Sequence, residues 1–588
     1  MYRFEIWAPF AKALSVSLKG VARTMNGPDS DGWWLLDAED AVPGMDYGFL
    51  IDNDPACYPD PRSQWQPNGV HKLSRLYDQT AFGWTDAHFQ PPPLATGILY
   101  ELHIGTFTPK GTFDAAISRL DHLVDLGISY VELMPVSTFE GQYGWGYDGV
   151  SLYAVHQPYG GPDGLKRFVN AAHEKGLAVL LDVVYNHFGP SGNYTGKFGP
   201  YIIDSHHTPW GGAVNLEGAG SCQVRRFFID NALMWLRDYH IDGLRLDAVH
   251  AFVDRSAIHF LEQLAIEVEA LEASLARRLV LIAESDLNDP RVVTPREAGG
   301  FGIDAQWSDD FHHALFTVLC PGETRGYYED FGSLAQLAKA LTATFVYDGI
   351  YSRYRNRIHG RPAGFLSQHR FLGYIQNHDQ VGNRAVGDRI SRIAGMDRAK
   401  IAAAFVLLGP FVPLIFQGEE WAASTPFQYF ANHQDPALAR AVSKGRKEEF
   451  SAFGWDAASI PDPESPSTFH SSKLKWDELL APTHREMLAW YGSLIRLRRN
   501  NPCLNDPKPG NTFVTFDGHE SWIRMDRGSI EVICNLAASD RAFPVPPESK
   551  VLLASRTVQQ DIDGKVALPP EAIAVLTTPG PFNSCHPS

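Results

Sequence analysis

The segment Ala178-Val-Leu-Leu-Asp-Val-Val-Tyr-Asn-His187 decides the fold of this chain. Up to Val184 it is apolar except for Asp182, which is typical of a β-strand that is buried on both faces. Seven further segments have the same character, and helical patterns such as Phe113–Leu126 and Gly164–Lys175 lie between several of them. The eight predicted strands are Ile98–Ile104, Tyr130–Pro135, Ala178–Val184, Gly243–Asp247, Leu279–Glu284, Gly302–Trp307, Phe371–Gln376 and Pro413–Gln417.

Buried strands that alternate with helices predict an α/β fold, a closed (β/α)8 TIM barrel over residues 96–500. Two connections in it are long, 188–226 and 308–370, and long loops of this fold usually build the active site. Residues 1–95 show alternating segments separated by turn clusters, which predicts an N-terminal β-sandwich. The alternating pattern returns in 501–588, where we expect a C-terminal antiparallel β domain.

The composition restricts the possible partners and the compartment. The 588 residues carry 68 acidic and 51 basic side chains, a net charge of −17, so nucleic acid and anionic membranes are not expected as partners. Six widely separated cysteines without a CxxC pair are typical of reduced thiols in a cytoplasmic protein. Arg3 and Glu5 interrupt any apolar signal core, so we expect no secretory signal. The longest apolar segment, 401–416, contains Pro410 and Pro413 and predicts a buried helix, a loop and a strand rather than a membrane span.

Carboxylates lie at or near the carboxyl-terminal ends of several predicted strands. They are Asp182, Asp247, Glu284 and Asp379. Any one of them could simply cap a loop, but four at the rim where this fold places its active site predict a catalytic centre, and paired carboxylates are the groups that glycosidases use. Arg245 lies on the same strand face as Asp247, which favours Asp247 as an ionised nucleophile. Glu284 has apolar sequence neighbours, so we expect a raised pKa and a proton to donate there.

Four segments, in this order, resemble the signature regions of the α-amylase superfamily of retaining glycosidases. They read Asp182-Val-Val-Tyr-Asn186-His187, Gly243-Leu-Arg245-Leu-Asp247-Ala-Val-His250, Ala283-Glu284-Ser285 and Gln376-Asn377-His378-Asp379. The resemblance covers the whole chain and implies an N-terminal sandwich similar to carbohydrate-binding modules. It implies that Asp247 is the nucleophile, that Glu284 is the general acid and base, and that Asp379 binds sugar hydroxyls and supports the transition state.

Further residues are predicted to bind substrate or support the site, most of them because the same resemblance implies it. They are Tyr147, Asp182, His187, Arg245, His250, Trp307, Asp310 and His378. Tyr147 would be the aromatic platform for the first donor sugar, and we expect Trp307 and Phe311 to stack on pyranose faces, which are apolar. Many members of the superfamily have Lys-His where this chain has His250-Ala251, so an amylase-like acceptor subsite is not expected.

Within the superfamily, several segments are most similar to the enzymes that cut the α-1,4 bond next to the trehalose end of maltooligosyl trehalose. They are Asp247–Ala251, Ala283–Arg291, Asp304–His313 and Asn377–Arg384. This implies maltooligosyl trehalose and α-1,4-glucans as substrates, and a pathway shared with maltooligosyltrehalose synthase. One alternative is a glucan branching enzyme, which has a similar architecture. The other alternative is a catalytically inactive barrel that binds a glycan or a protein. The loss of one of the three carboxylates Asp247, Glu284 and Asp379 would indicate such a barrel, but all three carboxylates are present.

A structural calcium ion is the remaining question, because many amylases hold one near the position of Asn186. Calcium takes six to eight oxygen ligands. The loop 188–215 offers a single acid, Asp204. We therefore predict no metal and no cofactor.

Overall fold

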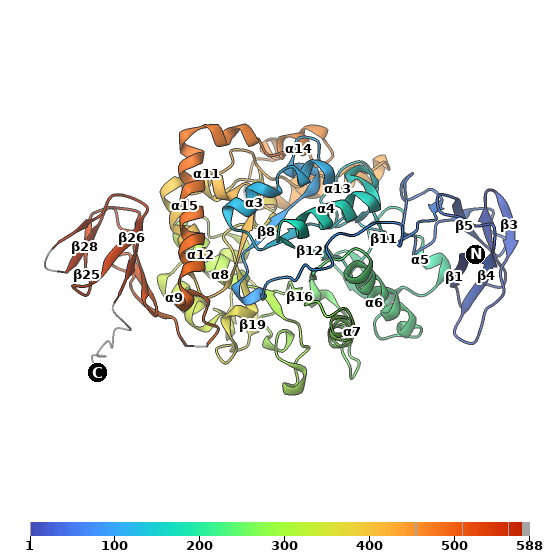
Figure 1. Ribbon diagram of the computed structural model, residues 1–588, viewed down its shortest axis with the longest axis horizontal. Coiled ribbons are helices and arrows are strands. Elements are labelled where there is room, and N and C mark those ends of the chain that lie inside the picture. Colours follow the sequence, from blue (N-terminus) through green and yellow to red (C-terminus); the bar gives the residue numbers. More distant parts are fainter. Residues whose placement is uncertain (1, 453–454, 509, 562–563, 579–588) are drawn as a thin grey trace.

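The computed structural model describes residues 2–452, 455–508, 510–561 and 564–578. Three parts follow one another along the long axis of the molecule (Figure 1). The N-terminal sheets lie at one end in blue, the barrel occupies the centre, and the C-terminal sheets lie at the opposite end in red. Within the described ranges, no helix is both long and apolar enough to cross a membrane.

Eight parallel strands close into a barrel, and each coincides with one of the predicted segments. The predicted TIM barrel is therefore confirmed, with strands that are mostly shorter than expected. In barrel order they are β8 (Leu99–Leu102), β9 (Tyr130–Leu133), β12 (Ala178–Val183), β15 (Gly243–Leu246), β16 (Val280–Ala283), β17 (Ala305–Trp307), β20 (Phe371–Gly373) and β21 (Val412–Phe416).

Successive residues of each strand point alternately into the barrel and outward to the helices. Leu180 and Ile282 belong to the cluster that fills the barrel interior, whereas Val179 packs in the outer core. Because both faces are buried, the strands read as continuous apolar runs. Asp182 and Glu284 lie two residues beyond Leu180 and Ile282, so they continue the inward-pointing set and reach the carboxyl-terminal rim.

Most helices lie between the barrel strands in the sequence, and α13 and α15 follow the last of these strands. The longer ones are α4 (Gly161–Glu174), α6 (Ser221–Asp238), α7 (Phe260–Leu275), α8 (Asp309–Leu319), α9 (Leu334–Ala343), α12 (Met396–Leu408), α13 (Pro436–Ala452) and α15 (Pro482–Asn500). The helix predicted over Phe113–Leu126 is divided into α2 (Phe113–Ile117) and α3 (Leu120–Leu126). The Ser118 hydroxyl donates to the Ala115 carbonyl at 2.7 Å, a local bond that competes with continuation of α2.

Both long connections contain a β-hairpin. The first hairpin joins β13 (Ile202–Thr208) to β14 (Gly211–Val214), and the second joins β18 (Asp348–Ser352) to β19 (Arg357–Gly360). Hydrogen-bonded strands fix the shape of these connections, so their turns can hold side chains over the barrel rim.

Antiparallel sheets form the N-terminal part. One pairs β1 (Tyr2–Trp7) with β4 (Trp33–Ala38); the other contains β3 (Val21–Thr24), β2 (Leu14–Leu18), β5 (Asp46–Ile51), β6 (Cys57–Tyr58) and β7 (Ser74–Arg75). Arg62 attaches this part to the barrel, because its Nη1 donates to the Tyr153 hydroxyl at 3.0 Å and to Asp230 Oδ2 at 2.8 Å.

The C-terminal part is antiparallel, as predicted. A five-stranded sheet contains β22 (Phe513–Asp517), β23 (Trp522–Arg527), β24 (Ile530–Asn535), β29 (Ala572–Thr577) and β26 (Lys550–Ala554). A three-stranded sheet contains β25 (Arg541–Pro544), β28 (Lys565–Leu568) and β27 (Gln559–Gln560). Arg527 joins this part to the barrel by donating to the carbonyls of Leu408 at 3.1 Å and Gly409 at 2.6 Å.

Candidate active site

A cavity of about 580 Å³ opens at the carboxyl-terminal ends of the barrel strands. The predicted site residues that line it are Tyr147, His187, Asp247, His250, Glu284, His378 and Asp379. Asp182 and Arg245 are buried and contact these residues from below. The fold therefore gathers at one cavity side chains that are spread over more than 200 residues of sequence.

Arg245 is the buried centre of the site. Its Nη1 donates to Asp247 Oδ1 and to Asp182 Oδ2, both at 2.8 Å, and its Nη2 lies 3.0 Å from Glu284 Oε2. One guanidinium thus contacts both carboxylates that were predicted to act on the glycosidic bond. Burial raises the pKa of Asp182 to about 7, although the positive charge of Arg245 opposes this shift.

The surroundings of Glu284 differ from the sequence-based expectation. Besides Arg245, the backbone N–H of Ala248 donates to Glu284 Oε2 at 2.8 Å. Across the ranges that the structure describes, no donor reaches the other oxygen, Oε1. The apolar sequence neighbours of Glu284 do not indicate these contacts, because Arg245 lies on the neighbouring strand β15 and Ala248 follows that strand.

Tyr147 and His378 form a second polar network beside the carboxylates. The Tyr147 hydroxyl donates to Asp182 Oδ2 at 2.5 Å and lies 2.7 Å from His378 Nε2. The other ring nitrogen of His378 contacts the Glu101 carboxylate, which also accepts the His378 backbone N–H at 2.9 Å. Burial disfavours the charged ring, but Asp379 and Glu101 outweigh it and raise the pKa of His378 to about 9. This ring is therefore an imidazolium at neutral pH.

His187 and Trp210 form an aromatic wall of the cavity. Their rings stack with centroids 5.0 Å apart and planes 9° apart, and Trp210 projects from the turn of the β13–β14 hairpin. His187 Nε2 lies 3.1 Å from the Tyr147 carbonyl oxygen, and Nδ1 lies 2.9 Å from Asn186 Oδ1. Burial lowers the pKa of His187, so this ring is neutral where His378 is charged.

Helix α13 contributes to the site, and the sequence analysis missed it. It carries Arg446 and Glu449 into the lining of the cavity. Arg446 Nη1 lies 3.4 Å from Asn383 Oδ1, and Asn383 Nδ2 donates to Asp379 Oδ1 at 3.1 Å. The available sequence signal for this contribution was a charged helical pattern after the last barrel strand. That pattern lies outside the four segments that resemble the family.

A smaller cavity of about 200 Å³ adjoins the first and shares Glu284 and Asp379 with it. Trp307, at the end of β17, is one of the residues that line it. Asp286 lines both cavities and accepts from Arg355 Nη2 at 2.9 Å. Arg355 projects from the turn of the β18–β19 hairpin, so the second long connection also reaches the site.

Two residues predicted to contact sugar in the segment after β17, Asp310 and Phe311, lie away from both cavities. Asp310 lines neither cavity; its Oδ2 accepts the backbone N–H groups of Val346 at 2.6 Å and Tyr347 at 2.8 Å. Phe311 is fully buried in the outer core. Consecutive side chains of a helix point about 100° apart, so when Asp309 faces the smaller cavity its neighbours face elsewhere.

The residues near the expected calcium position do not fit that ion. Asn186 Oδ1 already contacts His187, and Asp204 is exposed on β13. Among the residues with described positions, no three His, Cys, Asp or Glu side chains converge as ligands of a metal ion. A calcium site would need more oxygen ligands than these residues provide.

Comparisons with known proteins agree with this geometry. The model of the alpha-amylase catalytic domain matches residues 68–199, and that of a domain of unknown function matches 510–575. The chain is 49% identical to the malto-oligosyltrehalose trehalohydrolase of Rhizobium sp. (strain M-11), over 98% of this chain and 97% of the relative. The chain belongs to the malto-oligosyltrehalose trehalohydrolase family.

Other trehalohydrolases show the same extent of similarity. The protein of that name from Arthrobacter ramosus is 51% identical, over 96% of this chain and 97% of the relative. A solved structure described as a putative alpha amylase from Salmonella typhimurium has a TM-score of 0.90 and 36% identity, and the match covers 98% of this chain and 97% of that one. A 1,4-alpha-glucan branching enzyme from Corynebacterium jeikeium is 27% identical, over 71% of this chain and 60% of the relative. The expected α-amylase-type architecture is confirmed, and the trehalohydrolase family is favoured over branching enzymes.

Proposed function

We propose that this protein hydrolyses the α-1,4 bond next to the trehalose end of maltooligosyl trehalose, with retention of configuration. The observation that carries the proposal is the convergence of Asp247, Glu284 and Asp379 on one cavity, with Arg245 between the first two. The trehalohydrolase name of relatives at 41–51% identity supports the choice of substrate. The products are trehalose and a maltooligosaccharide.

The chemistry proceeds in two displacements. Asp247 attacks the anomeric carbon through Oδ2, because Oδ1 accepts from Arg245, while the bond to the leaving oxygen breaks. Glu284 gives that oxygen its proton, which we place on Oε1, because Ala248 N–H and Arg245 point to Oε2. Water then gives a proton to Glu284 and displaces Asp247 from the anomeric carbon.

The strand register supports a retaining mechanism. Leu246 of β15 pairs directly with Ala283 of β16, and Asp247 and Glu284 are the next residue on each strand. Adjacent strands lie about 4.8 Å apart. This spacing is compatible with the roughly 5–5.5 Å between the carboxyl groups of retaining enzymes and tight for the roughly 6.5–9.5 Å of inverting ones.

The smaller cavity is our proposed site for the far glucose of the leaving trehalose. It contains Glu284, the acid that protonates the leaving oxygen, but not Asp247. Asp286, Arg355 and Trp307 line it, so it combines hydrogen-bonding groups with an aromatic ring. A site built to bind the hydroxyls of trehalose discriminates against an α-1,4-linked pair, because some polar groups would then lack partners.

Proton NMR of the first products tests the proposal. We expect maltotriosyl trehalose to give trehalose and maltotriose, with the new reducing end first released as the α-anomer. Maltopentaose, measured in parallel, should react much more slowly. Initial release of the β-anomer would contradict the retaining mechanism, and equal rates on maltopentaose would contradict the trehalose specificity.

The branching-enzyme alternative predicts a different product, new α-1,6 linkages formed from amylose, which the same NMR experiment would detect.

We further propose a cytoplasmic location and a pathway in which maltooligosyltrehalose synthase supplies the substrate. The cysteines whose positions are described are all free thiols, which supports a reducing compartment.

A further inference from the structure

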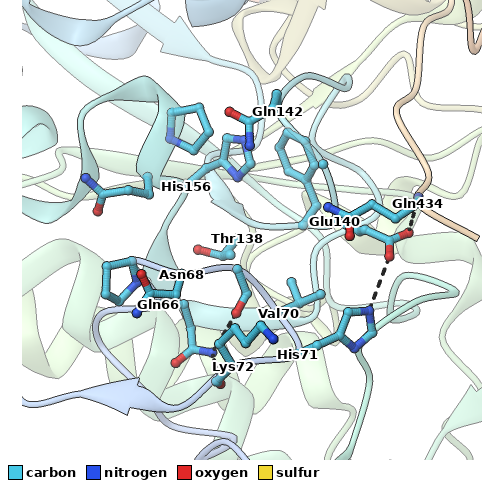
Figure 2. Close-up of a pocket in the computed structure, with 16 residues that line it drawn as sticks. Gln66, Asn68, Val70, His71, Lys72, Thr138, Glu140, Gln142, His156 and Gln434 are labelled. Atoms are coloured by element: carbon cyan, nitrogen blue, oxygen red, sulfur yellow. Dashed lines mark hydrogen bonds and ion pairs between the residues drawn. The ribbon is translucent and has the colours of Figure 1, made fainter. Parts of the chain in front are cut away.

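A second polar pocket lies between the N-terminal part and the barrel (Figure 2). Its volume is about 320 Å³, and it shares no lining residue with the catalytic cavity. One wall is residues 66–72, which connect β6 to β7. The other wall consists of 138–142 and 156–158 of the barrel, and Gln434 completes the rim. The pocket therefore exists only when the two parts are joined.

The floor of this pocket is aromatic and carries unsatisfied polar atoms. His156 is 1% exposed and stacks on Phe139, with ring centroids 3.8 Å apart and planes 14° apart. Within the described chain, neither ring nitrogen of His156 makes a hydrogen bond of normal geometry. Burial lowers the pKa of His156 to about 3, against a smaller effect of the Gln142 backbone, so the ring is neutral. A neutral imidazole has one N–H donor and one acceptor nitrogen; the Gln142 backbone interacts with the ring N–H, and an acceptor without a partner is costly in a buried site.

Amide side chains surround the mouth of the pocket. Asn68, Gln142 and Gln434 are exposed and project from three separate segments, as Figure 2 shows. Among the residues placed by the structure, none forms a hydrogen bond with these three side-chain amides. Each amide provides donors and an acceptor. The rim is thus suited to hydroxyl groups, which also donate and accept.

The charges of the pocket do not favour an ionic ligand. The Glu140 carboxylate lies 3.2 Å from His71 Nε2 and accepts the backbone N–H of Gln434 at 3.1 Å. Lys72 contributes one opposite charge at the exposed edge. A neutral ligand with apolar faces and a rim of hydroxyls matches a floor of Phe139 and His156 beneath a rim of amides. A pyranose ring has these properties.

We propose that this pocket is a second, non-catalytic binding site for one or two glucose units of an α-1,4-glucan. Its volume is at the lower end of the roughly 300–1,000 Å³ range of small-molecule pockets, which suits a short segment rather than a long chain. The choice of an α-1,4-glucan as the ligand rests on the proposed function, because the proposed substrate contains α-1,4-linked glucose. A second site on the same molecule raises the effective concentration of long substrates near the first.

Isothermal titration of maltoheptaose into the full-length Asp247→Asn protein tests the pocket, because this variant cannot turn the ligand over. We expect two classes of site. Adding His156→Phe, which keeps the stacked ring but removes both nitrogens, should weaken one class at least tenfold and leave the other unchanged. The double substitution Asn68→Ala and Gln142→Ala at the exposed rim should do the same without touching the core. Gln559→Ala, an exposed amide on β27, is the matched control and should change neither class.

A single class of site in the Asp247→Asn protein would overturn the proposal. Two classes that both persist unchanged in the rim variant would also overturn it, whatever the folding of His156→Phe. Failure of the proposed function would be seen in the product NMR experiment, where the wild-type protein would release no trehalose from maltotriosyl trehalose. The two failures are therefore distinguishable.

Discussion

At the scale of single residues, our proposal assigns Asp247 as the nucleophile that forms the bond to the sugar. Asp247→Asn keeps the size of the side chain but removes the nucleophilic charge, so we expect trehalose release to fall by at least about 10⁴-fold. The rate of trehalose release and the circular dichroism spectrum would be measured together. Asp204→Asn, an exposed acid of the β13–β14 hairpin, should keep the wild-type rate. A folded Asp247→Asn protein with appreciable activity would refute the nucleophile assignment.

His378 makes stability depend on pH at the alkaline end. Its pKa is about 9 in the folded protein against an ordinary value of 6.5, because Asp379 and Glu101 outweigh the burial of the ring. A raised pKa stabilises the fold fully below about pH 6.5, and this contribution disappears as the pH rises through about 9. The difference corresponds to on the order of 3 kcal/mol.

Urea unfolding of the wild type and of His378→Asn, from pH 6.5 to pH 10, measures this contribution. We expect the difference in unfolding free energy between the two proteins to shrink as the pH rises. A difference that is the same at pH 7 and pH 10 would show that His378 is not held as an imidazolium.

At the scale of elements, the β18–β19 hairpin should set the preference for trehalose. Its turn holds Arg355, whose Nη2 contacts Asp286 at 2.9 Å in the smaller cavity. Arg355→Lys keeps the charge but removes the planar fork, so we expect kcat/KM for maltotriosyl trehalose to fall about tenfold, and that for maltopentaose to change little. Arg357→Lys, exposed on the same hairpin, is the control. Equal losses on both substrates would assign Arg355 a purely structural role.

Helix α13 should tighten the donor side of the catalytic cavity. Arg446 contacts Asn383, which in turn donates to Asp379, so Arg446→Ala should loosen the carboxylate that we expect to bind sugar hydroxyls. We expect kcat/KM to fall by about 10–100-fold, the range found when groups that orient an active-site residue are lost. Lys444→Ala, on the exposed side of the same helix, should have the wild-type rate. Equal activities of the two variants would exclude α13 from the catalytic machinery.

At the scale of the whole molecule, we expect no dependence on divalent metal ions. Asn186 and Asp204 do not form a set of oxygen ligands that would satisfy calcium. Exhaustive dialysis against EDTA should leave both the rate of trehalose release and the thermal midpoint unchanged. A reversible loss that added calcium restores would contradict this prediction.

The sequence was sufficient to predict the barrel strands and to single out the carboxylates that line the larger cavity. A barrel strand is buried on both faces, so segments such as Ala178–Val183 are apolar throughout and can be recognised without knowing their partners. The active site of this fold lies at the strand ends, so Asp247 and Glu284 were identified from their position in each strand. These features depend on residues that are close together in the chain, which is why a one-dimensional pattern records them.

Only the tertiary structure decided what surrounds those carboxylates. Glu284 faces Arg245 and Ala248 rather than its apolar sequence neighbours, because groups from the adjacent strand and its extension contact it across the barrel rim. Asp309 rather than Asp310 faces the smaller cavity, because the turn into α8 sets the direction of each side chain. Arg446 and Arg355 enter the site from elements far away in the chain. Such contacts depend on distances in space between distant residues, and local periodicity carries no information about them.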